Sequence, residues 1–313
     1  MKFLERALDN QNQIWKYIVM ALAVWIGAQI IGGIPLFIVI IINLATNGAG
    51  AISPQNMMDF SVLGISQNVG LLLMLIPFIV GILVMIPLLR GLHKRTLSET
   101  INGRKKIRWN RFLMGAFVWT VLMGIYFVVS YFISPDNFVL QFEIGKFIPL
   151  LLISLLLIPW QASLEEIFFR GYLAQGIAAW TKSRWLAIII PGVIFGLMHF
   201  RNPEVNEFGF WATMPQYIGF GLFFGLISIL DDGIELAMGA HVANNIFSSV
   251  FITHKASALQ TPAVFEQLTI DIHHESLTLF ISCILAILIF SRKYKWNFSI
   301  LNKKITNNSE NIS

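Results

Sequence analysis

Charged residues and cysteine are both scarce in this chain of 313 residues. Asp, Glu, Lys and Arg together make up 12% of the sequence, whereas a soluble domain carries about 25%. Hydrophobic residues make up 56%, and the chain holds 26 Phe. So much apolar surface cannot be hidden in a water-soluble core. The composition therefore excludes an ordinary soluble globular protein and indicates that lipid surrounds the chain.

The single cysteine, Cys283, lies within an apolar run near the C-terminus. One thiol forms neither an intrachain disulfide nor a CxxC metal site, so neither a disulfide framework nor a zinc finger is expected. We interpret Cys283 as a small apolar packing residue. The sequence also has no internal repeat, which weighs against a transporter built from duplicated halves.

Eight apolar segments approach or exceed the roughly 20 residues that a helix needs to cross a bilayer. They are 15–44, 69–91, 111–134, 146–176, 184–200, 214–231, 234–253 and 276–292. Lipid offers no partner to unpaired backbone groups, and the alternating pattern of barrel strands is absent, so each segment is expected to be helical. The expected fold class is therefore all-α: a polytopic transmembrane helix bundle of about eight spans, with the lipid bilayer as its surroundings.

Lys and Arg are distributed unevenly between the connections. The N-terminal arm, the segment 90–111, the connection at 182–184 and the C-terminal tail carry 18 of them, against 2 in the loops of the other side. This bias predicts that both termini and the basic loop 90–111 lie in the cytoplasm. The net charge of +5 is thus a topology signal, and no nucleic-acid partner is expected. The loop is interpreted as a solvated contact for anionic headgroups.

Three regions are expected along the chain. Residues 1–145 hold the first three helices and the basic loop, residues 146–253 hold helices four to seven, and residues 254–313 hold the final helix and a polar tail. The last ten residues are rich in Asn and Ser and are predicted to be disordered.

Ionisable side chains appear within the spans of the middle region, where each costs about 2.5 kcal/mol or more and is a functional candidate by default. Glu166 and Arg170 are spaced i,i+4 with the acid first, the favourable order for an ion pair. Glu165 points about 100° away, towards Gln161 and Phe169, and has no such partner. We expect Glu166 and Arg170 to be structural and Glu165 to be available as a general base.

His199 shares a helical face with Phe195, and the spacing of Gly192 and Gly196 favours close approach of another helix. Alone, His199 could equally be a satisfied interhelical hydrogen bonder. His199 lies about 15 residues into its helix, which would place it near the outer face of the membrane. Glu165 would lie nearer the cytoplasmic face, so the two expected depths disagree. We therefore predict that helix five is not a straight, full span.

His241 and Asn245 are also spaced i,i+4, and two hydrogen-bond donors at that separation can hold a developing oxyanion. Asn244 points elsewhere and is expected to tie helices together. Nearby, a cytoplasmic turn and a helix N-terminus account for the acidic side chains of Asp231, Asp232 and Glu235.

These elements together resemble the pattern of the intramembrane glutamic peptidases, the CPBP or Rce1-like/Abi family, which includes the CAAX-processing protease Rce1 and bacterial bacteriocin-processing and immunity relatives. The family pattern is EExxxR, then FxxxH, then HxxxN. Each motif alone is weak, but all three in order on expected spans are specific. The matching region is about 146–252, a third of the chain. Its residues are Glu165-Glu166-IFF-Arg170, Phe195-GLM-His199 and His241-VAN-Asn245.

The resemblance implies that Glu165 and His199 activate a water molecule while His241 and Asn245 form the oxyanion site. Glu166 and Arg170 would support them, and 146–253 would be the catalytic core. The predicted function is an intramembrane endopeptidase of the bacterial plasma membrane that cleaves a peptide or membrane-anchored protein near the cytoplasmic interface. Prenylated CAAX proteins, bacteriocin leaders and membrane-anchored regulators are the open substrate classes.

Other chemistries remain to be weighed. No cofactor is expected, but the family has also been described as metal-dependent, so zinc held by Glu165, His199 and His241 is an alternative. The helical zinc motif HExxH is missing, and His273-His274-Glu275 has the wrong spacing. Ser163 has no Gly-x-Ser-x-Gly turn or lysine at the spacing that serine chemistry needs. A non-catalytic scaffold, immunity factor or transporter would instead use the buried polar groups only to hold helices or a ligand.

Overall fold

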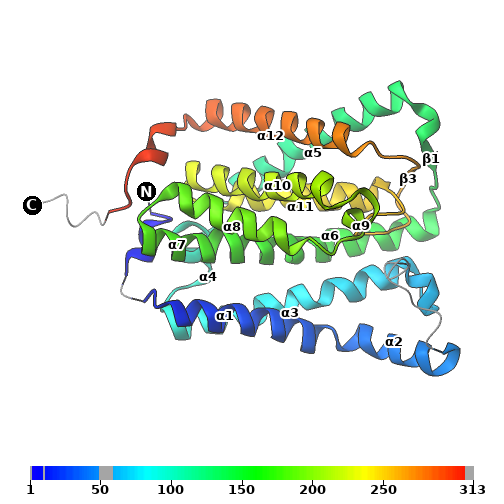
Figure 1. Cartoon of the computed structure of the whole chain (residues 1–313), viewed down its shortest axis with the longest axis horizontal. Helices are drawn as coiled ribbons and strands as arrows, with labels where there is room; N and C mark the ends of the chain where they lie inside the picture. Colours follow the sequence, from blue (N-terminus) through cyan, green and yellow to red (C-terminus); the bar gives the residue numbers. More distant parts are fainter. Residues whose placement is uncertain (1, 10, 49–58, 307–313) are drawn as a thin grey trace, which may run out of the picture.

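Helices aligned along one long axis make up almost the whole protein (Figure 1). The computed structural model describes residues 2–9, 11–48 and 59–306. The long helices are α1 (Ile14–Gly27), α2 (Ile34–Asn47), α3 (Gln67–His93), α5 (Trp109–Ile133), α6 (Ile144–Glu166), α8 (Arg184–Met198), α10 (Phe210–Leu230), α11 (Glu235–Val250) and α12 (Ile272–Tyr294). The shorter ones are α4 (Leu97–Asn102), α7 (Ala174–Thr181) and α9 (Pro203–Phe208).

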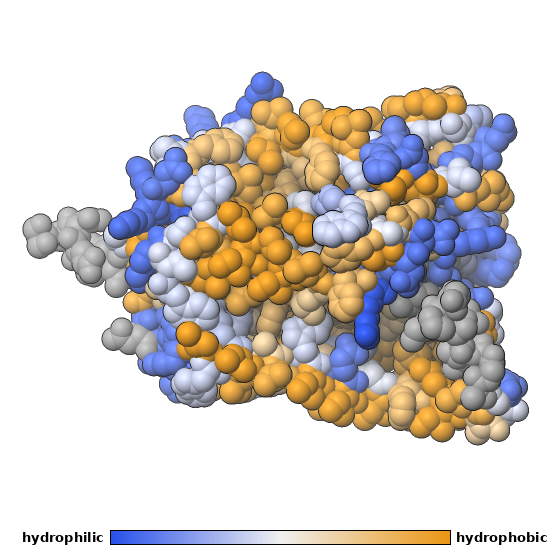
Figure 2. Space-filling view, in the orientation of Figure 1, coloured by the Kyte–Doolittle hydropathy of each residue, from blue (hydrophilic) through white to orange (hydrophobic). Residues whose placement is uncertain are grey.

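Within the described residues, six helical stretches are long and apolar enough to cross a membrane. They are Ile14–Gly32, Gln67–His93, Trp109–Ile133, Ile144–Thr181, Phe210–Leu230 and Ile272–Tyr294. On the visible face, apolar residues cover most of the middle, and hydrophilic residues gather towards the two ends (Figure 2). The expected all-α, multi-pass membrane architecture is confirmed.

The count of eight spans is not confirmed. The segments expected at 184–200 and 234–253 form α8, with 15 residues, and α11, with 16 residues. At 1.5 Å per residue these helices are about 22–24 Å long, less than the roughly 30 Å of a hydrocarbon core. The length of α8 agrees with the prediction that helix five is not a full span. A break near Pro191 does not occur, since α8 continues through it.

The first expected span, 15–44, is divided. α1 passes through a π-helical turn at Ala28–Gly32 before α2 begins at Ile34. Gly32 allows α3 to approach closely, because a Cβ at this position would lie 2.4 Å from the Cα of Pro77. Absence of a side chain at Gly32 therefore fixes where α1 and α3 pack.

A small sheet departs from the purely helical pattern. β1 (Phe138–Leu140) pairs antiparallel with β3 (Phe265–Gln267), and β3 pairs parallel with β2 (Ile252–Thr253). The strands lie at the end of the bundle opposite both chain termini (Figure 1). We call the end with the termini the terminal end and the other the sheet end. That the terminal end faces the cytoplasm remains a prediction.

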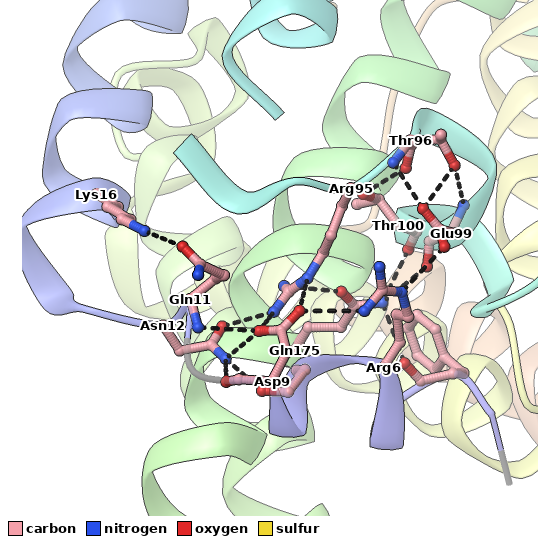
Figure 3. Close-up of polar contacts among 12 residues, drawn as sticks. Arg6, Asp9, Gln11, Asn12, Lys16, Arg95, Thr96, Glu99, Thr100 and Gln175 are labelled. Atoms are coloured by element: carbon pink, nitrogen blue, oxygen red, sulfur yellow. Dashed lines mark hydrogen bonds and ion pairs between the residues drawn. The ribbon is translucent and has the colours of Figure 1, made fainter. Parts of the chain in front are cut away.

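The basic loop 90–111 is only partly solvated, contrary to expectation: Lys94, Lys105 and Lys106 are exposed, but Arg95 is not. Arg95 is 1% exposed and its guanidinium bonds to Asp9 and Asn12 of the N-terminal segment and to Gln175 of α7 (Figure 3). A capping box of Thr96 and Glu99 begins α4 inside this loop. The loop therefore fastens the N-terminal segment to α7.

The acidic turn between α10 and α11 is also buried, which corrects the interpretation of Asp231, Asp232 and Glu235 as solvated. Arg108 binds Glu235 at 2.5 Å and Asp231 at 3.1 Å, and Arg104 binds Asp232 at 2.6 Å. Two cations from the basic loop thus form ion pairs with all three acids of the turn. We call these five residues the turn network.

The C-terminal tail is partly ordered. Leu301 and Ile305 are buried in the main core, and the backbone N–H of Ile305 donates to the carbonyl of Lys182. The disorder predicted for the last ten residues is therefore wrong for 304–306, and 307–313 lie outside the described residues. Cys283 is buried among apolar neighbours, as expected.

Candidate active site

A helical hairpin brings Glu165 and His199 together. The helix that begins as α6 continues through the π-helical segment η5 (Ile167–Leu173) and α7 to Thr181, and α8 starts at Arg184. Glu165 lies 16 residues before Thr181, and His199 lies 15 residues after Arg184. Residues equally far from the turn of an antiparallel hairpin lie at similar depth. The sequence placed Glu165 and His199 at different depths because the span that contains Glu165 was expected to end at 176. It continues to Thr181 instead, so Glu165 lies nearer the middle of its span and the difference in depth disappears.

Gly192 and Gly196 allow α10 to pack against α8, as the sequence predicts. A Cβ on Gly192 would lie 2.9 Å from the carbonyl carbon of Gly221, and a Cβ on Gly196 would lie 2.7 Å from the backbone nitrogen of Ile218. This close approach places Tyr217 of α10 against the ring of His199, stacked at 4.6 Å and 17°.

Glu165 is a buried carboxylate with one oxygen occupied. Its Oε1 accepts a hydrogen bond of 2.7 Å from Nε2 of Gln161, one helical turn earlier. Its Oε2 has no hydrogen-bond partner within the described residues and lies 3.6 Å from Nε2 of His241. That separation is too long for a direct hydrogen bond, but one water can lie about 2.8 Å from both atoms.

Glu166 and Arg170 form the expected ion pair, at 2.9 Å, with both side chains almost completely buried. Glu166 Oε1 also accepts from Nδ1 of His241 at 2.8 Å. The two adjacent glutamates therefore flank one imidazole, one at each ring nitrogen. The chain leaves α-helical geometry directly after them, at Ile167, and π-helical turns often occur at functional sites.

Both histidines are held through Nδ1, and this fixes their proton arrangement. Nδ1 of His199 lies 2.8 Å from the carbonyl oxygen of Phe195, which can only accept, so this nitrogen carries a proton. Nδ1 of His241 likewise faces the ion-paired Glu166. In the neutral form of each ring, Nε2 is therefore the atom with a lone pair.

Asn245 belongs to a chain of side-chain amides that ends on Glu165. Asn245 donates to Oε1 of Gln161 at 2.8 Å, and Gln161 donates to Glu165. Asn244 donates to Oδ1 of Asn245 and accepts from Trp119 of α5, so it ties helices together as expected. Gln161 was not among the predicted site residues, although its i−4 spacing from Glu165 was a usable signal.

One cavity of about 490 Å³ contains the four predicted catalytic residues in its lining: Glu165, His199, His241 and Asn245. Ser163 is not part of the lining. The cavity continues past α9 to Gln267 and Ile272, near β3 and the start of α12, so it extends towards the sheet end (Figure 1). Sequence reasoning did not find three further polar residues of the lining, Asn202, Glu204 and Tyr217.

The three proposed zinc ligands are not gathered as a metal site. Glu165 and His241 are 3.6 Å apart, and Nδ1 of His241 bonds to Glu166 while Nε2 faces Glu165, an arrangement that metal-binding histidines also adopt. Across 2–9, 11–48 and 59–306, however, no group of three or more His, Cys, Asp and Glu side chains is arranged to hold a metal ion. As placed, Glu165, His199 and His241 therefore do not form a three-ligand zinc site.

The fold and the cavity define a multi-pass helical membrane protein with an ionisable site enclosed by its helices. A family model described as Type II CAAX prenyl endopeptidase Rce1-like matches residues 145–247. The uncharacterized protein YyaK of Bacillus subtilis (strain 168) is 32% identical over 254 residues, covering 80% of this chain and 82% of YyaK. The chain belongs to the Rce1-like (CPBP) family. No solved structure matches it.

Family membership supports an intramembrane protease activity of the CAAX type and a bacterial multi-pass membrane protein. The match at 145–247 contains all three sequence motifs. It ends before the loop 254–259, which lines the outer part of the cavity.

Proposed function

We propose that this protein is an intramembrane endopeptidase in which Glu165 activates a water molecule for attack on a peptide bond. The observation that carries the proposal is the unpartnered Oε2 of Glu165, buried beside the cavity and 3.6 Å from Nε2 of His241. An unsatisfied buried oxygen costs about 1–3 kcal/mol, which is readily understood if a water normally occupies that position.

In the proposed reaction, Glu165 takes one proton from the water while the oxygen attacks the carbonyl carbon. Gln161 keeps the carboxylate oriented through its bond to Oε1. The carbonyl oxygen becomes an oxyanion and rests on Asn245 and His241. His241 donates through Nε2 only when both ring nitrogens carry protons, since Nδ1 is committed to Glu166.

Collapse of the tetrahedral intermediate breaks the C–N bond, and the leaving amine takes up the proton that Glu165 removed from the water. In the proposed mechanism His199 relays this proton from Glu165 to the amine, because Nδ1 is bonded to the carbonyl of Phe195 and Nε2 is the nitrogen with a lone pair. Glu166 and Arg170 act as positioning residues: their ion pair fixes the ring of His241 and touches no reacting atom.

The same residues permit a second candidate, a non-catalytic scaffold or immunity protein that uses the cavity to hold a ligand. The extensive amide chain from Asn244 to Glu165 would then serve stability alone.

The test is Glu165→Gln in the purified full-length protein reconstituted in vesicles. For the peptidase, cleavage of a membrane peptide substrate falls by at least about 10³-fold, while the melting temperature stays close to that of the wild type, because Gln keeps the shape and the bond to Gln161. Retained cleavage would remove Glu165 from the mechanism.

Metal content measured on the same sample separates the zinc alternative. Activity that is lost on chelation and restored by zinc would favour metal chemistry and contradict the water activation proposed for Glu165.

A further inference from the structure

The outer part of the cavity contains a second carboxylate, Glu204, on α9. Oε1 of Glu204 accepts a 2.8 Å hydrogen bond from the backbone N–H of Ala258 in the loop 254–259. Its Oε2 is buried and has no hydrogen-bond partner in the described part of the chain. A carboxylate needed only to anchor the loop would not require this second oxygen to be enclosed and unsatisfied.

Glu204 is close to the predicted catalytic machinery. Tyr217 stacks on His199 with 4.6 Å between ring centroids. The hydroxyl of Tyr217 accepts from Asn202 at 2.9 Å and lies next to Glu204, where it favours the ionised carboxylate. Burial acts more strongly in the opposite direction, so the pKa of Glu204 is raised. One tyrosine side chain thus separates His199 from a carboxylate that lacks a cation.

Within the described residues, the carboxylates of the cavity lining face no Lys or Arg side chain in the same lining. The lining includes three glutamates and three histidines, and no Lys or Arg from the described residues. Arg170 is 1% exposed and paired with Glu166 beneath the cavity. Buried carboxylates without a neighbouring cation favour a cationic guest and disfavour an anionic one.

Resting on the proposed peptidase function, we propose that Glu204 is a specificity residue that binds a Lys or Arg side chain of the substrate close to the scissile bond. The substrate segment then lies in the outer part of the cavity and reaches it from the sheet end. The preferred bond is therefore one flanked by a basic residue.

Binding to non-cleaving protein tests this without requiring hydrolysis. The Glu165→Gln protein in phosphatidylcholine vesicles is titrated with labelled peptides that cross the membrane once. The peptides differ only in one residue, which is Lys, Gln or Glu. This residue is moved stepwise along the half of the peptide that would lie in the outer part of the cavity. At one position, we expect Lys to bind at least about tenfold more tightly than Gln, and Glu to bind more weakly than Gln. Adding Glu204→Gln should abolish this preference.

The matched control is Glu143→Gln, which removes an exposed carboxylate at the same end of the bundle, and there the Lys preference should persist. Equal binding of Lys and Gln at every position would overturn the inference, as would a preference that survives Glu204→Gln. The same peptides are then offered to wild-type protein. Selective binding of the Lys peptide without any cleavage would support the cation site and refute the peptidase. Cleavage that does not depend on the charge of the peptide would support the peptidase and refute the cation site.

Discussion

The turn network and the cavity of the candidate active site both bury several ionisable groups, yet they differ in how these groups are paired. In the turn network, Arg104 and Arg108 give every acid a cation at 3.1 Å or less. In the cavity, Glu165 and Glu204 each keep an oxygen without a partner. Paired buried charges hold elements together, whereas unpaired atoms beside a cavity are available to a ligand or a water.

The largest difference between an effect on cleavage and an effect on stability is expected for His199→Ala, in the cavity. Loss of a proton carrier should reduce the rate of peptide cleavage by about 10²–10⁴-fold. The melting temperature should fall less than in Glu166→Gln, because the ring makes one hydrogen bond within the described residues, to the carbonyl of Phe195, and its stacking on Tyr217 contributes about 0.5–1.5 kcal/mol. Cleavage assays and thermal melting of the same preparation check both parts. A large loss of stability with normal cleavage would place His199 with the structural groups.

Glu166→Gln is expected to affect both properties, since Glu166 holds Arg170 and His241 at once. Removing one partner of a buried ion pair costs about 3–5 kcal/mol. Cleavage should fall as well, because His241 loses its orientation. Combining Glu166→Gln with Arg170→Met removes the stranded cation and should restore stability but not activity. If activity also returns, Glu166 has no positioning role.

Arg108→Gln should affect stability alone. It leaves Glu235 and Asp231 without their shared cation and is expected to destabilise the protein by about 3 kcal/mol, with cleavage per folded molecule unchanged. Chemical denaturation in detergent provides the measurement. The control is Lys146→Gln, whose exposed pair with Glu143 should contribute less than about 1 kcal/mol.

The smallest effect is a pH dependence in the turn network. Burial raises the pKa of Asp231 from 3.8 to about 6, and Arg108 and Arg111 only partly oppose it. Between pH 4 and 6 the folded state therefore binds more protons at this site than the unfolded state, so its contribution to stability falls as pH rises through that window. Melting temperatures at pH 5 and 7 should differ less in Asp231→Asn than in the wild type. An unchanged difference would contradict the shift.

The helix bundle and the ion pair of Glu166 with Arg170 could be predicted, because hydropathy and i,i+4 spacing are local properties. The role of α11 could not be read from hydropathy alone, because a helix covered by its neighbours can be apolar without spanning lipid. The shortness of α8 could not be read either, because its apolar run continues past the end of the helix at Met198. The contact between His241 and both glutamates depends on the packing of α11 against α6, which no spacing within one segment encodes. Glu204 was missed because it lies outside every motif, on a six-residue helix.

The two-residue turn between α7 and α8 sets the register of Glu165 against His199. Lys182 adopts a left-handed conformation with φ of 57°, and Ser183 caps α8 by accepting from the backbone N–H of Leu186. One residue added between Arg184 and His199 would advance the imidazole by about 1.5 Å and rotate it by about 100°. Insertions and deletions are therefore tolerable before Glu165, in the segment that leads into α6, and after His199, in the segment that follows α9. They are not tolerable between Glu165 and His199.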